Sequence, residues 1–282
     1  MSSSNSSRNH LVESTSKYGL IAGNGRFPFL VLEAAKSQGI RMTVVAIKEE
    51  TLPEIEQEAG TVHWLSLGQL GKLIKTFKAE GVTRVVMAGQ VKHKQLFSGI
   101  VPDLTMLKML GSLATKSTDS LIGGVAKVLA IEGIDLVDST AFLGPLLPDP
   151  GVLTARAPSK EEQTDLDYGY RIARELGRLD LGQSVVVGDG ACVALEAMEG
   201  TDAIVARAAS LVNGRPLTLV KLAKPNQDLR FDVPVVGPGT IDNMVQANVR
   251  ALAIEARKTL MIDKDNMIKA ADDNLITIVA VE

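Results

Sequence analysis

The first half of the chain alternates short apolar runs with helical patterns, and glycines punctuate the alternation. Residues 18–22 form an apolar run that ends at Gly-Asn-Gly in positions 23–25. A helical pattern over residues 29–38 follows, and residues 41–47 are a second run rich in β-branched side chains. The order strand, glycine loop, helix, strand predicts a βαβ unit, and strands joined by such a crossover are parallel.

The same alternation continues toward residue 142. Residues 67–80 are amphipathic with helical spacing, and residues 84–88 form a third apolar run that ends at Gly89. Residues 103–133 are mainly helical in pattern, and residues 134–139 fit a short strand or connector. Strands that alternate with helices predict a parallel sheet covered by helices on both faces, so the fold class is α/β with a Rossmann-like first domain.

Two glycine-bearing loops follow predicted strands. Ligands of open parallel sheets bind outside the carboxyl ends of the strands. The candidate binding residues there are Gly23, Asn24, Gly25, Gly89 and Gln90. The first loop lacks the third glycine of the dinucleotide fingerprint and the Gly-Lys-Ser/Thr ending of a Walker A loop. Two interpretations therefore stay open: a loop whose backbone amides hold a phosphate, or a plain tight turn.

The second half begins after a stretch rich in proline. Residues 143–158 contain four prolines and two glycines, which predicts a hinge. We therefore expect a flexible tail over residues 1–16, a Rossmann-like domain over residues 17–142 and a C-terminal α/β domain over residues 143–282. Its predicted helices are residues 163–179, 201–211, 241–256 and 266–271, and its predicted strands are 184–188, 191–198, 218–222, 259–262 and 275–281. Because alternation is less strict here, we expect a mixed sheet.

Composition excludes several classes of protein. Lys plus Arg is 30 and Asp plus Glu is 33, which is not the basic excess of a nucleic-acid binder. The single cysteine, Cys192, lies in an apolar run and is interpreted as a small buried hydrophobe. The polar first 16 residues resemble no signal peptide, and no run reaches the roughly 18 apolar residues of a membrane span. We expect a cytoplasmic protein, and peripheral contact with a membrane surface stays compatible.

A charged segment follows the predicted strand at 218–222. It carries Lys221, Lys224, Gln227, Asp228, Arg230 and Asp232. If the segment is extended, Asp228, Arg230 and Asp232 project to one side. Two carboxylates with an arginine between them could hold Mg²⁺ and a phosphate together, because Mg²⁺ prefers oxygen ligands and Arg binds phosphate with two hydrogen bonds. The alternative is a solvated loop with a structural ion pair.

Further acidic residues open predicted helices. Thr201 or Asp202 fits a helix cap, whereas Glu196, Glu199 and Asp202 could instead join a metal cluster. Asp119 also lies where a helix begins. The three histidines, His10, His63 and His93, share no metal-ligand spacing, and no Ser-His-Asp or Cys-His arrangement is visible. A serine or cysteine hydrolase is therefore disfavoured.

These segments together resemble the UDP-2,3-diacylglucosamine pyrophosphatases of lipid A synthesis. The resemblance rests on residues 196–202, 221–234 and 271–273, and on residues 19–25, 88–91 and 179–183, in the same order. It implies a Rossmann-like N-terminal domain, a family-defining C-terminal domain and a substrate between them. It also implies Mg²⁺-dependent hydrolysis of UDP-2,3-diacylglucosamine to 2,3-diacylglucosamine 1-phosphate and UMP, and a homodimer.

The resemblance also assigns site residues. The family's key carboxylate lies in an Arg-x-Asp-Leu-Pro context, which here is Arg230 to Pro234 with Val233 in place of Leu, so Asp232 is the predicted catalytic residue. Where the family often has two adjacent acids this chain has Thr118 and Asp119, and only Asp119 is carried over. The predicted metal ligands are Asp232, Asp228, Glu199 and Asp202. The predicted substrate-binding residues are Gly23, Asn24, Gly25, Gly89, Gln90, Asp119, Glu196, Thr201, Lys221, Lys224, Gln227 and Arg230.

These assignments combine into one hypothesis. Asp232 orients Mg²⁺ or the attacking water, while Lys221, Lys224 and Arg230 contact the phosphates. The glycine loops take the uridine or sugar end, and the apolar helices between residues 103 and 131 are candidates for the acyl chains. The alternatives are a non-catalytic nucleotide or lipid sensor, and another nucleotide-sugar enzyme such as a transferase or dehydrogenase.

Overall fold

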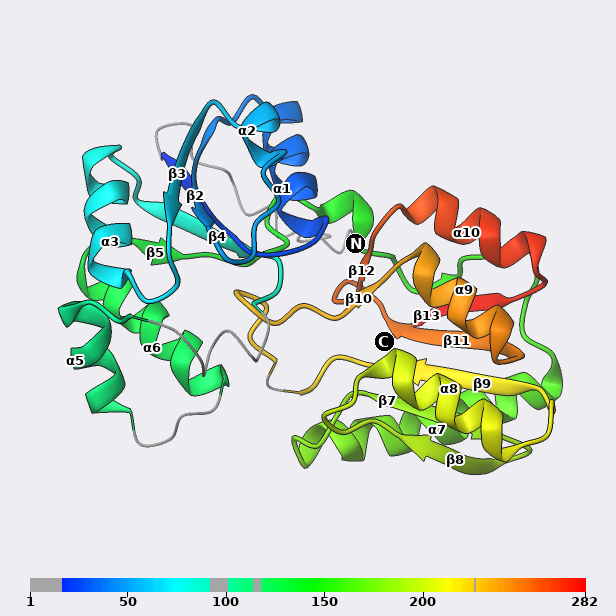
Figure 1. The fold of residues 1–282 in the computed structure, drawn as a ribbon. Coiled ribbons are helices and arrows are strands. Elements are labelled where there is room, and N and C mark those ends of the chain that lie inside the picture. Colours follow the sequence, from blue (N-terminus) through cyan, green and yellow to red (C-terminus); the bar gives the residue numbers. More distant parts are fainter. Residues whose placement is uncertain (1–16, 92–100, 114–117, 226) are drawn as a thin grey trace, which may run out of the picture. The chain divides into compact units, whose positions relative to one another are not determined.

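The computed structural model describes residues 17–91, 101–113, 118–225 and 227–282, apart from the side chains at 118 and 119. The chain divides into two compact units, residues 1–142 and residues 143–282. Figure 1 shows the helices and strands of both units. Each unit is described by itself below.

Unit 1 contains a five-stranded, fully parallel sheet, as predicted. Its strands are β1 (Tyr18–Ala22), β2 (Met42–Ile47), β3 (Thr61–Leu65), β4 (Arg84–Ala88) and β5 (Asp135–Leu136). Its helices are α1 (Phe27–Ser37), α2 (Ile55–Glu58), α3 (Leu70–Ala79), α5 (Leu104–Ser112) and α6 (Thr118–Ile131). The strand order is β3-β2-β1-β4-β5, so the chain changes direction across the sheet between β1 and β4. These are the first five strands of the Rossmann order 3-2-1-4-5-6.

Side-chain spacing explains how a helix of unit 1 packs. The buried residues of α3 are Leu70, Leu73, Ile74 and Phe77, which is the spacing of one helical face. Phe77 is fully buried, and a Cβ at position 19 would lie 2.6 Å from its ring. Gly19 in β1 therefore makes room for the largest side chain of this face.

Unit 2 contains a mixed sheet, as predicted, and its six strands lie in the order β6-β13-β11-β9-β7-β8. Its strands are β6 (Gly151–Val152), β7 (Ser184–Gly188), β8 (Ala191–Leu195), β9 (Leu217–Lys221), β11 (Val249–Glu255) and β13 (Thr277–Val281). Strands β13, β11 and β9 are parallel, and β6, β7 and β8 pair antiparallel. A separate parallel pair joins β10 (Val235–Val236) to β12 (Leu260–Met261). The helices are α7 (Lys160–Arg178), α8 (Thr201–Leu211), α9 (Pro238–Gln246) and α10 (Lys264–Asp273), with a 3₁₀ turn η1 (Gly144–Leu146).

The predicted helix over residues 241–256 is wrong. Helix α9 ends at Gln246, Asn248 adopts a positive φ of 54°, and the chain then enters β11. β11 lies inside the sheet between β9 and β13 and is buried on both faces, so its sequence is an almost unbroken apolar run instead of an alternating one. Periodicity cannot distinguish such a run from a buried helix, and its two alanines also favour a helical interpretation.

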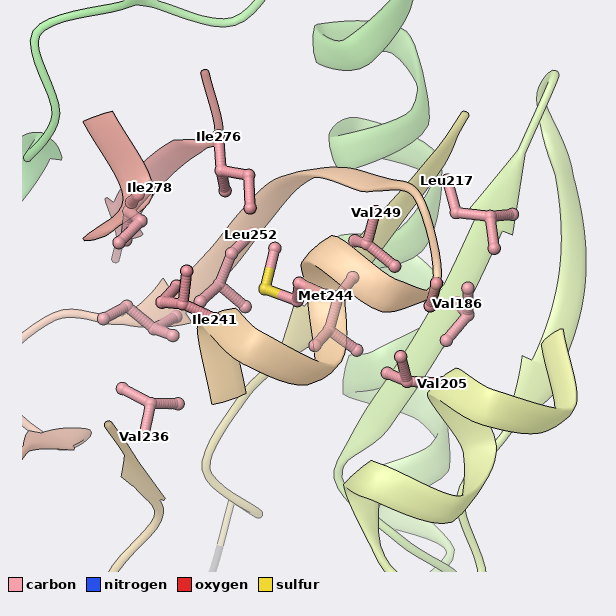
Figure 2. Close-up of a cluster of buried hydrophobic side chains, with 14 of the residues drawn as sticks. Val186, Val205, Leu217, Val236, Ile241, Met244, Val249, Leu252, Ile276 and Ile278 are labelled. Atoms are coloured by element: carbon pink, nitrogen blue, oxygen red, sulfur yellow. The ribbon is translucent and has the colours of Figure 1, made fainter. Parts of the chain in front are cut away.

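Two apolar cores lie on opposite faces of this sheet. Leu252 and Ile254 of β11 pack into the larger core, which Figure 2 shows between the sheet and the helices α8 and α9. Ala251 and Ala253 of the same strand face the second core, which α7 covers. One strand thus contributes alternate side chains to both cores. In the described parts of the chain, no helix is long and apolar enough to cross a bilayer.

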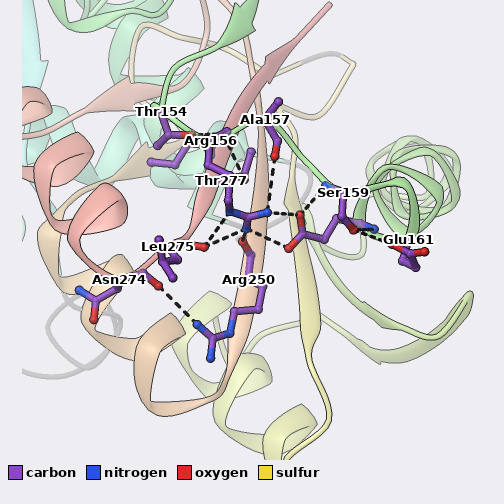
Figure 3. Close-up of polar contacts among 11 residues, drawn as sticks. Thr154, Arg156, Ala157, Ser159, Glu161, Arg250, Asn274, Leu275 and Thr277 are labelled. Carbon is purple, nitrogen blue, oxygen red and sulfur yellow. Dashed lines mark hydrogen bonds and ion pairs between the residues drawn. The ribbon is translucent and has the colours of Figure 1, made fainter.

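Arg156 ties the segment before α7 to the sheet (Figure 3). Its guanidinium donates to both carboxylate oxygens of Glu162, at 2.6 and 2.9 Å. It also donates to the carbonyl oxygens of Leu275 at 2.8 Å and Arg250 at 3.0 Å. Glu162 in turn accepts the backbone N–H of Ser159 and completes a capping box at the start of α7. Sequence reasoning did not single out Arg156.

Candidate active site

The two glycine loops of unit 1 meet at the point where the strand order reverses. The Gly23 amide donates to the Ala88 carbonyl (2.8 Å), and Asn24 and Gln90 exchange two backbone hydrogen bonds of 2.8 and 3.1 Å. Strands β1 and β4 are neighbours, so both loops lie at the carboxyl ends of adjacent parallel strands. The five predicted residues of these loops therefore come together at the usual ligand position of such a sheet.

Glycine is required at two of these positions. A Cβ at position 23 would lie 2.7 Å from the Gln90 carbonyl oxygen, and one at position 89 would lie 2.6 Å from that of Asn24. Gly89 also has a φ of +92°. The amide of Gly23 donates to the end of β4 and that of Asn24 to the other loop, so these two amides are not available to hold a phosphate.

The charged segment of unit 2 is a loop over residues 222–234, between β9 and β10. At its start, the Leu222 amide donates to the Gln183 carbonyl (3.0 Å) and the Ala223 amide donates to Glu255 Oε2 (3.0 Å). At its end, the Pro234 carbonyl accepts the amide of Leu260 (2.8 Å). Both ends of the loop are therefore attached to the sheet or to the β10–β12 pair.

The part of this loop from Asp228 to Asp232 is a turn and not extended. The Asp228 carbonyl accepts the amides of Phe231 (3.1 Å) and Asp232 (3.0 Å). The Arg230 guanidinium donates to both Asp228 oxygens at distances of 2.6 to 3.1 Å. These hydrogen bonds hold the pKa of Asp228 below its usual value. The structural ion pair of the alternative interpretation is therefore present, and the extended geometry that would place the three side chains on one side is not adopted.

Lys221 is the buried cation at the base of the loop. Its side chain leaves the last position of β9, and its residue is 9% exposed. Its Nζ donates to the Val235 carbonyl at 2.9 Å. Burial lowers the pKa of this ammonium, and the negative charges of Glu196, Asp202 and Asp232 lie near enough to oppose that shift. The charges of three of the predicted acidic residues thus act on this one lysine.

Glu196 is the buried member of this group. Its carboxylate accepts the Gln183 amide (3.2 Å) and the Thr201 hydroxyl (3.3 Å), and that hydroxyl is also 2.9 Å from Ser184 Oγ. A Cβ at position 182 would lie 2.2 Å from the Glu196 carbonyl oxygen, so only glycine fits there. The predicted residues Glu196 and Thr201 are therefore in contact.

The predicted helix cap at the start of α8 is wrong. The N-cap position is Gly200, which has a positive φ of 86° and makes no side-chain capping bond. Thr201 is instead the first residue of the helix, and its hydroxyl points to Glu196. Asp202 is exposed in the first turn, where a carboxylate is favoured by the helix dipole.

The four predicted metal ligands do not gather as one set. Glu199 is bound to Arg207 (2.9 Å) and to the Ala197 amide (2.9 Å), and Asp228 is paired with Arg230. Within the described residues, no three His, Cys, Asp or Glu side chains are placed to hold a metal ion together. The charges of Asp202 and Asp232 both act on Lys221. Carboxylates are ligands that Mg²⁺ accepts, because it usually takes one or two of them and completes its shell with water and phosphate oxygens.

The other predicted residues of the loop contact one another. Gln227 Oε1 accepts the Lys224 amide (2.8 Å), and Lys224 Nζ donates to Asp180 (2.6 Å). In the part of the chain that the structure describes, Gln227 Nε2 and Gln183 Oε1 are buried without a hydrogen-bond partner. A buried polar atom without a partner is costly, so both atoms are suited to receive a bound ligand.

Sequence reasoning missed one anchor of the loop, Glu255. This residue is 3% exposed, and its carboxylate accepts Lys258 Nζ (2.6 Å), Arg174 Nη1 (3.3 Å) and the Ala223 amide (3.0 Å). A glutamate that ends an apolar strand is a recognisable signal, because ligands and anchors gather at carboxyl ends of strands. The signal was hidden because residues 241–256 were assigned to one helix.

The remaining candidates belong to unit 1, to the second core of unit 2 or to residues outside the described ones. Asp119 lies in the first turn of α6, and its side chain is outside the described part, as are His10 and His93. His63 is 3.0 Å from Glu80 in unit 1. Burial raises the pKa of the Cys192 thiol, which fits a packing role and not a nucleophile.

Solved structures resemble this fold only weakly. The biotin carboxylase domain of the Hydrogenobacter thermophilus 2-oxoglutarate carboxylase is 13% identical, covers 62% of this chain and 35% of its own, and has a TM-score of 0.28. The phosphoribosylglycinamide synthetase from Anaerococcus prevotii is 12% identical, covers 61% of this chain and 31% of its own, and has a TM-score of 0.25. Likeness at this level carries no argument about fold or function.

Comparison of sequences is far more specific. Residues 17–146 match the family model of the LpxI N-terminal domain, and residues 149–279 match that of the LpxI C-terminal domain. The UDP-2,3-diacylglucosamine pyrophosphatase LpxI of Caulobacter vibrioides (strain ATCC 19089 / CIP 103742 / CB 15) is 34% identical over an alignment of 267 residues, and the alignment covers 91% of this chain and 94% of that protein. Both halves are matched in order and nearly from end to end. The chain therefore belongs to the LpxI family.

Proposed function

We propose that this protein hydrolyses the pyrophosphate of UDP-2,3-diacylglucosamine to 2,3-diacylglucosamine 1-phosphate and UMP, a step of lipid A biosynthesis. The observation that carries this proposal is the match over both domains to a pyrophosphatase that is 34% identical across 91% of the chain. The acidic and basic side chains at the base of loop 222–234 support it, because a non-catalytic sensor would not need clustered carboxylates to bind its ligand.

The reaction sets clear demands on the site. Water attacks one phosphorus, the bond from that phosphorus to the bridging oxygen breaks, and the proton of the water must be taken up. Negative charge grows on the phosphate oxygens as this happens, so cationic donors lower the barrier. We assign Asp232 to the water or to the metal, and we assign Lys224, Arg230 and the free Nε2 of Gln227 to the phosphate oxygens.

Mg²⁺ is the proposed cofactor. Asp232 and Asp202 would hold it, whereas Asp228 and Glu199 would first have to leave their arginine partners. When bound, the ion would neutralise charge on the pyrophosphate and lower the pKa of a bound water. The charged residues of the chain would keep the substrate oriented in the same place.

The remaining assignments are part of the same proposal. The glycine loops at residues 23–25 and 89–90, Asp119, and the pair Glu196 and Thr201 are proposed to bind the substrate. Because that substrate carries two acyl chains, we propose a cytoplasmic protein that touches the inner-membrane surface transiently. A homodimer is proposed from the family resemblance.

The test is UMP release from UDP-2,3-diacylglucosamine with Mg²⁺, measured for the wild type, Asp232→Ala and Asp242→Asn. We expect Asp232→Ala to lose at least about 100-fold in kcat, the usual contribution of a positioned acid or base. Asp242 is exposed on α9 and serves as the matched control, with unchanged activity. Wild-type-like UMP release by Asp232→Ala would remove its assigned role.

The same assay separates the alternatives. Binding of the lipid nucleotide by the wild type without any UMP release would favour a sensor. Turnover that requires NAD or a sugar acceptor would favour a dehydrogenase or a transferase. Release of UMP that stops when EDTA removes divalent ions, and returns with Mg²⁺, is the result expected from the proposal.

A further inference from the structure

One hydrogen bond joins the two ends of the loop that carries the candidate catalytic residues. Lys221 is the last residue of β9, and Val235 is the first residue of β10. The bond from Lys221 Nζ to the Val235 carbonyl is 2.9 Å long and spans 14 positions of sequence. Everything between them is the loop 222–234. Lys221 therefore closes this loop at its base.

The surroundings of Lys221 make this hydrogen bond unfavourable to break. Lys221 is 9% exposed, and a buried ammonium is tolerated only where hydrogen bonds and opposite charges replace its water. The Val235 carbonyl and the charges of Glu196, Asp202 and Asp232 supply that replacement. Glu196 is itself fixed by the Gln183 amide and the Thr201 hydroxyl. The lysine is thus fixed among groups that the fold already holds.

This arrangement differs from that of the other cations of the loop. The side chain of Lys224 is 27% exposed and that of Arg230 is 45% exposed, so both can turn toward a ligand from solvent. The charge of Lys221 is already compensated inside the protein. Direct contact with a phosphate, which the sequence suggested for Lys221, would require it to break its hydrogen bond to the Val235 carbonyl.

We propose that Lys221 is a positioning residue, which holds loop 222–234 closed on Val235 and thereby places Asp232, and that it does not itself contact the pyrophosphate. Asp232 lies three residues before Val235, so a shift of the loop end moves this carboxylate directly. A misplacement of about 1 Å can cost about 100-fold in rate even when binding is unchanged. This inference rests on the proposed function for its activity readout only.

The experiment replaces Lys221 by Met, which keeps the stem of the side chain and removes the ammonium. Lys269→Met is the matched control, because Lys269 is exposed on α10 and forms an ion pair with Asp273, one turn away on the same helix. Two quantities are measured: kcat and KM for UMP release, and amide hydrogen exchange over residues 222–235. In the wild type, the amides of Phe231 and Asp232 donate to Asp228, so their exchange reports the turn.

For Lys221→Met we expect kcat to fall by about 100-fold and KM to change by less than about threefold. Exchange at Phe231 and Asp232 should become about 10- to 100-fold faster, the factor that corresponds to losing a hydrogen bond with a charged donor. Lys269→Met should change neither quantity. A large rise in KM with unchanged kcat, or unaltered exchange in the loop, would overturn the proposal, since a phosphate ligand predicts those results.

A second variant keeps the test valid if Lys221→Met folds poorly because it leaves buried carboxylates unpaired. Lys221→Met combined with Glu196→Gln removes the buried one, and it is compared with Glu196→Gln alone. The same split between kcat and KM and the same faster exchange are expected, and their absence contradicts the proposal. If the wild type releases no UMP, the proposed function fails, while hydrogen exchange still decides whether Lys221 closes the loop.

Discussion

The glycine loops of unit 1 and the loop 222–234 of unit 2 are held in place by different kinds of contact. Each follows the carboxyl end of a strand inside its sheet, and each must stay ordered where little secondary structure supports it. In unit 1, main-chain hydrogen bonds among residues 23–24 and 88–90 join one loop to the other. In unit 2, the buried side chains of Lys221 and Glu255 attach the loop 222–234 in addition to two backbone hydrogen bonds at its ends.

The difference decides which substitutions each loop tolerates. Where backbone hydrogen bonds hold the loops, a substitution is harmful only if the new side chain has no room. This is the case at Gly23 and Gly89. Where charged side chains hold the backbone, the chemical identity of each anchor matters, because removal of one partner leaves another buried and unpaired. The glycine loops of unit 1 are therefore sensitive to added side-chain volume, and the loop 222–234 is sensitive to the loss of a charged anchor.

Gly89→Ala should disrupt the contact between the two glycine loops of unit 1, and it should have the largest effect on stability. The new Cβ would lie 2.6 Å from the Asn24 carbonyl oxygen, and φ is +92°, so both crowding and backbone strain oppose it. We expect about 3 kcal/mol of destabilisation. Urea unfolding followed by the fluorescence of Trp64, the single tryptophan and a β3 residue, reports unit 1.

Gly25→Ala is the control for this prediction. Gly25 has a similar φ of +90°, but no atom lies within 4 Å of a Cβ there. Its cost should be about 1 kcal/mol, from backbone strain alone. Equal destabilisation by the two variants would show that the close approach of the loops is not what requires glycine at position 89.

Glu255→Gln should weaken the attachment of the loop 222–234, and its effect on the free energy of unfolding should be intermediate. The substitution keeps the shape but removes the charge that Lys258, Arg174 and the Ala223 amide share. We expect about 2 kcal/mol of destabilisation and faster amide exchange at Ala223. Exchange in unit 1 should not change.

Glu175→Gln provides the comparison for a surface pair. Glu175 binds Arg178 on α7, and both side chains are about two-thirds exposed. Its removal should cost less than about 0.5 kcal/mol. If Glu255→Gln were equally mild in urea unfolding, the charged anchor would not be what attaches the loop.

A fall in pH is expected to change stability less than Gly89→Ala or Glu255→Gln does, and it tests the contrast between the two units. Burial opposes ionisation of Glu162, but the hydrogen bonds from Arg156 and Ser159 outweigh it and lower its pKa below the usual 4.5. A depressed folded pKa contributes stability above pH 4.5 that is lost as the pH falls through the folded value. We expect unit 2 to lose less than about 1 kcal/mol from this pair.

Arg156→Met should flatten that dependence on pH, since it removes the partner that lowers the pKa of Glu162. Amide exchange of unit 2, measured between pH 6 and pH 3.5 and corrected for intrinsic rates, tests this. The Gly23–Gly89 backbone contact involves no titratable side chain. An acid response unaffected by Arg156→Met would mean that other carboxylates, such as Asp228 beside Arg230, dominate.

Sequence reasoning succeeded where local signals agree with the fold. The strands at 84–88 and 184–188 and the helix at 201–211 all appear as predicted. It failed for residues 241–256, because a strand buried on both faces has no polar alternation to reveal it. It also failed for the turn from Asp228 to Asp232, because an ion pair two residues apart and a backbone turn leave no periodic pattern.

By itself the sequence determined the α/β class, the order of the elements in unit 1 and the candidate residues of both loops, because glycines at strand ends and ordered motifs are local properties of the chain. Only the tertiary structure decided what those residues do to one another. It brought the backbone at Gly23 and Gly89 into close contact, and it placed the buried Lys221 in a hydrogen bond to the Val235 carbonyl. These outcomes depend on partners distant in sequence, whose distances, burial and charge no local pattern can encode.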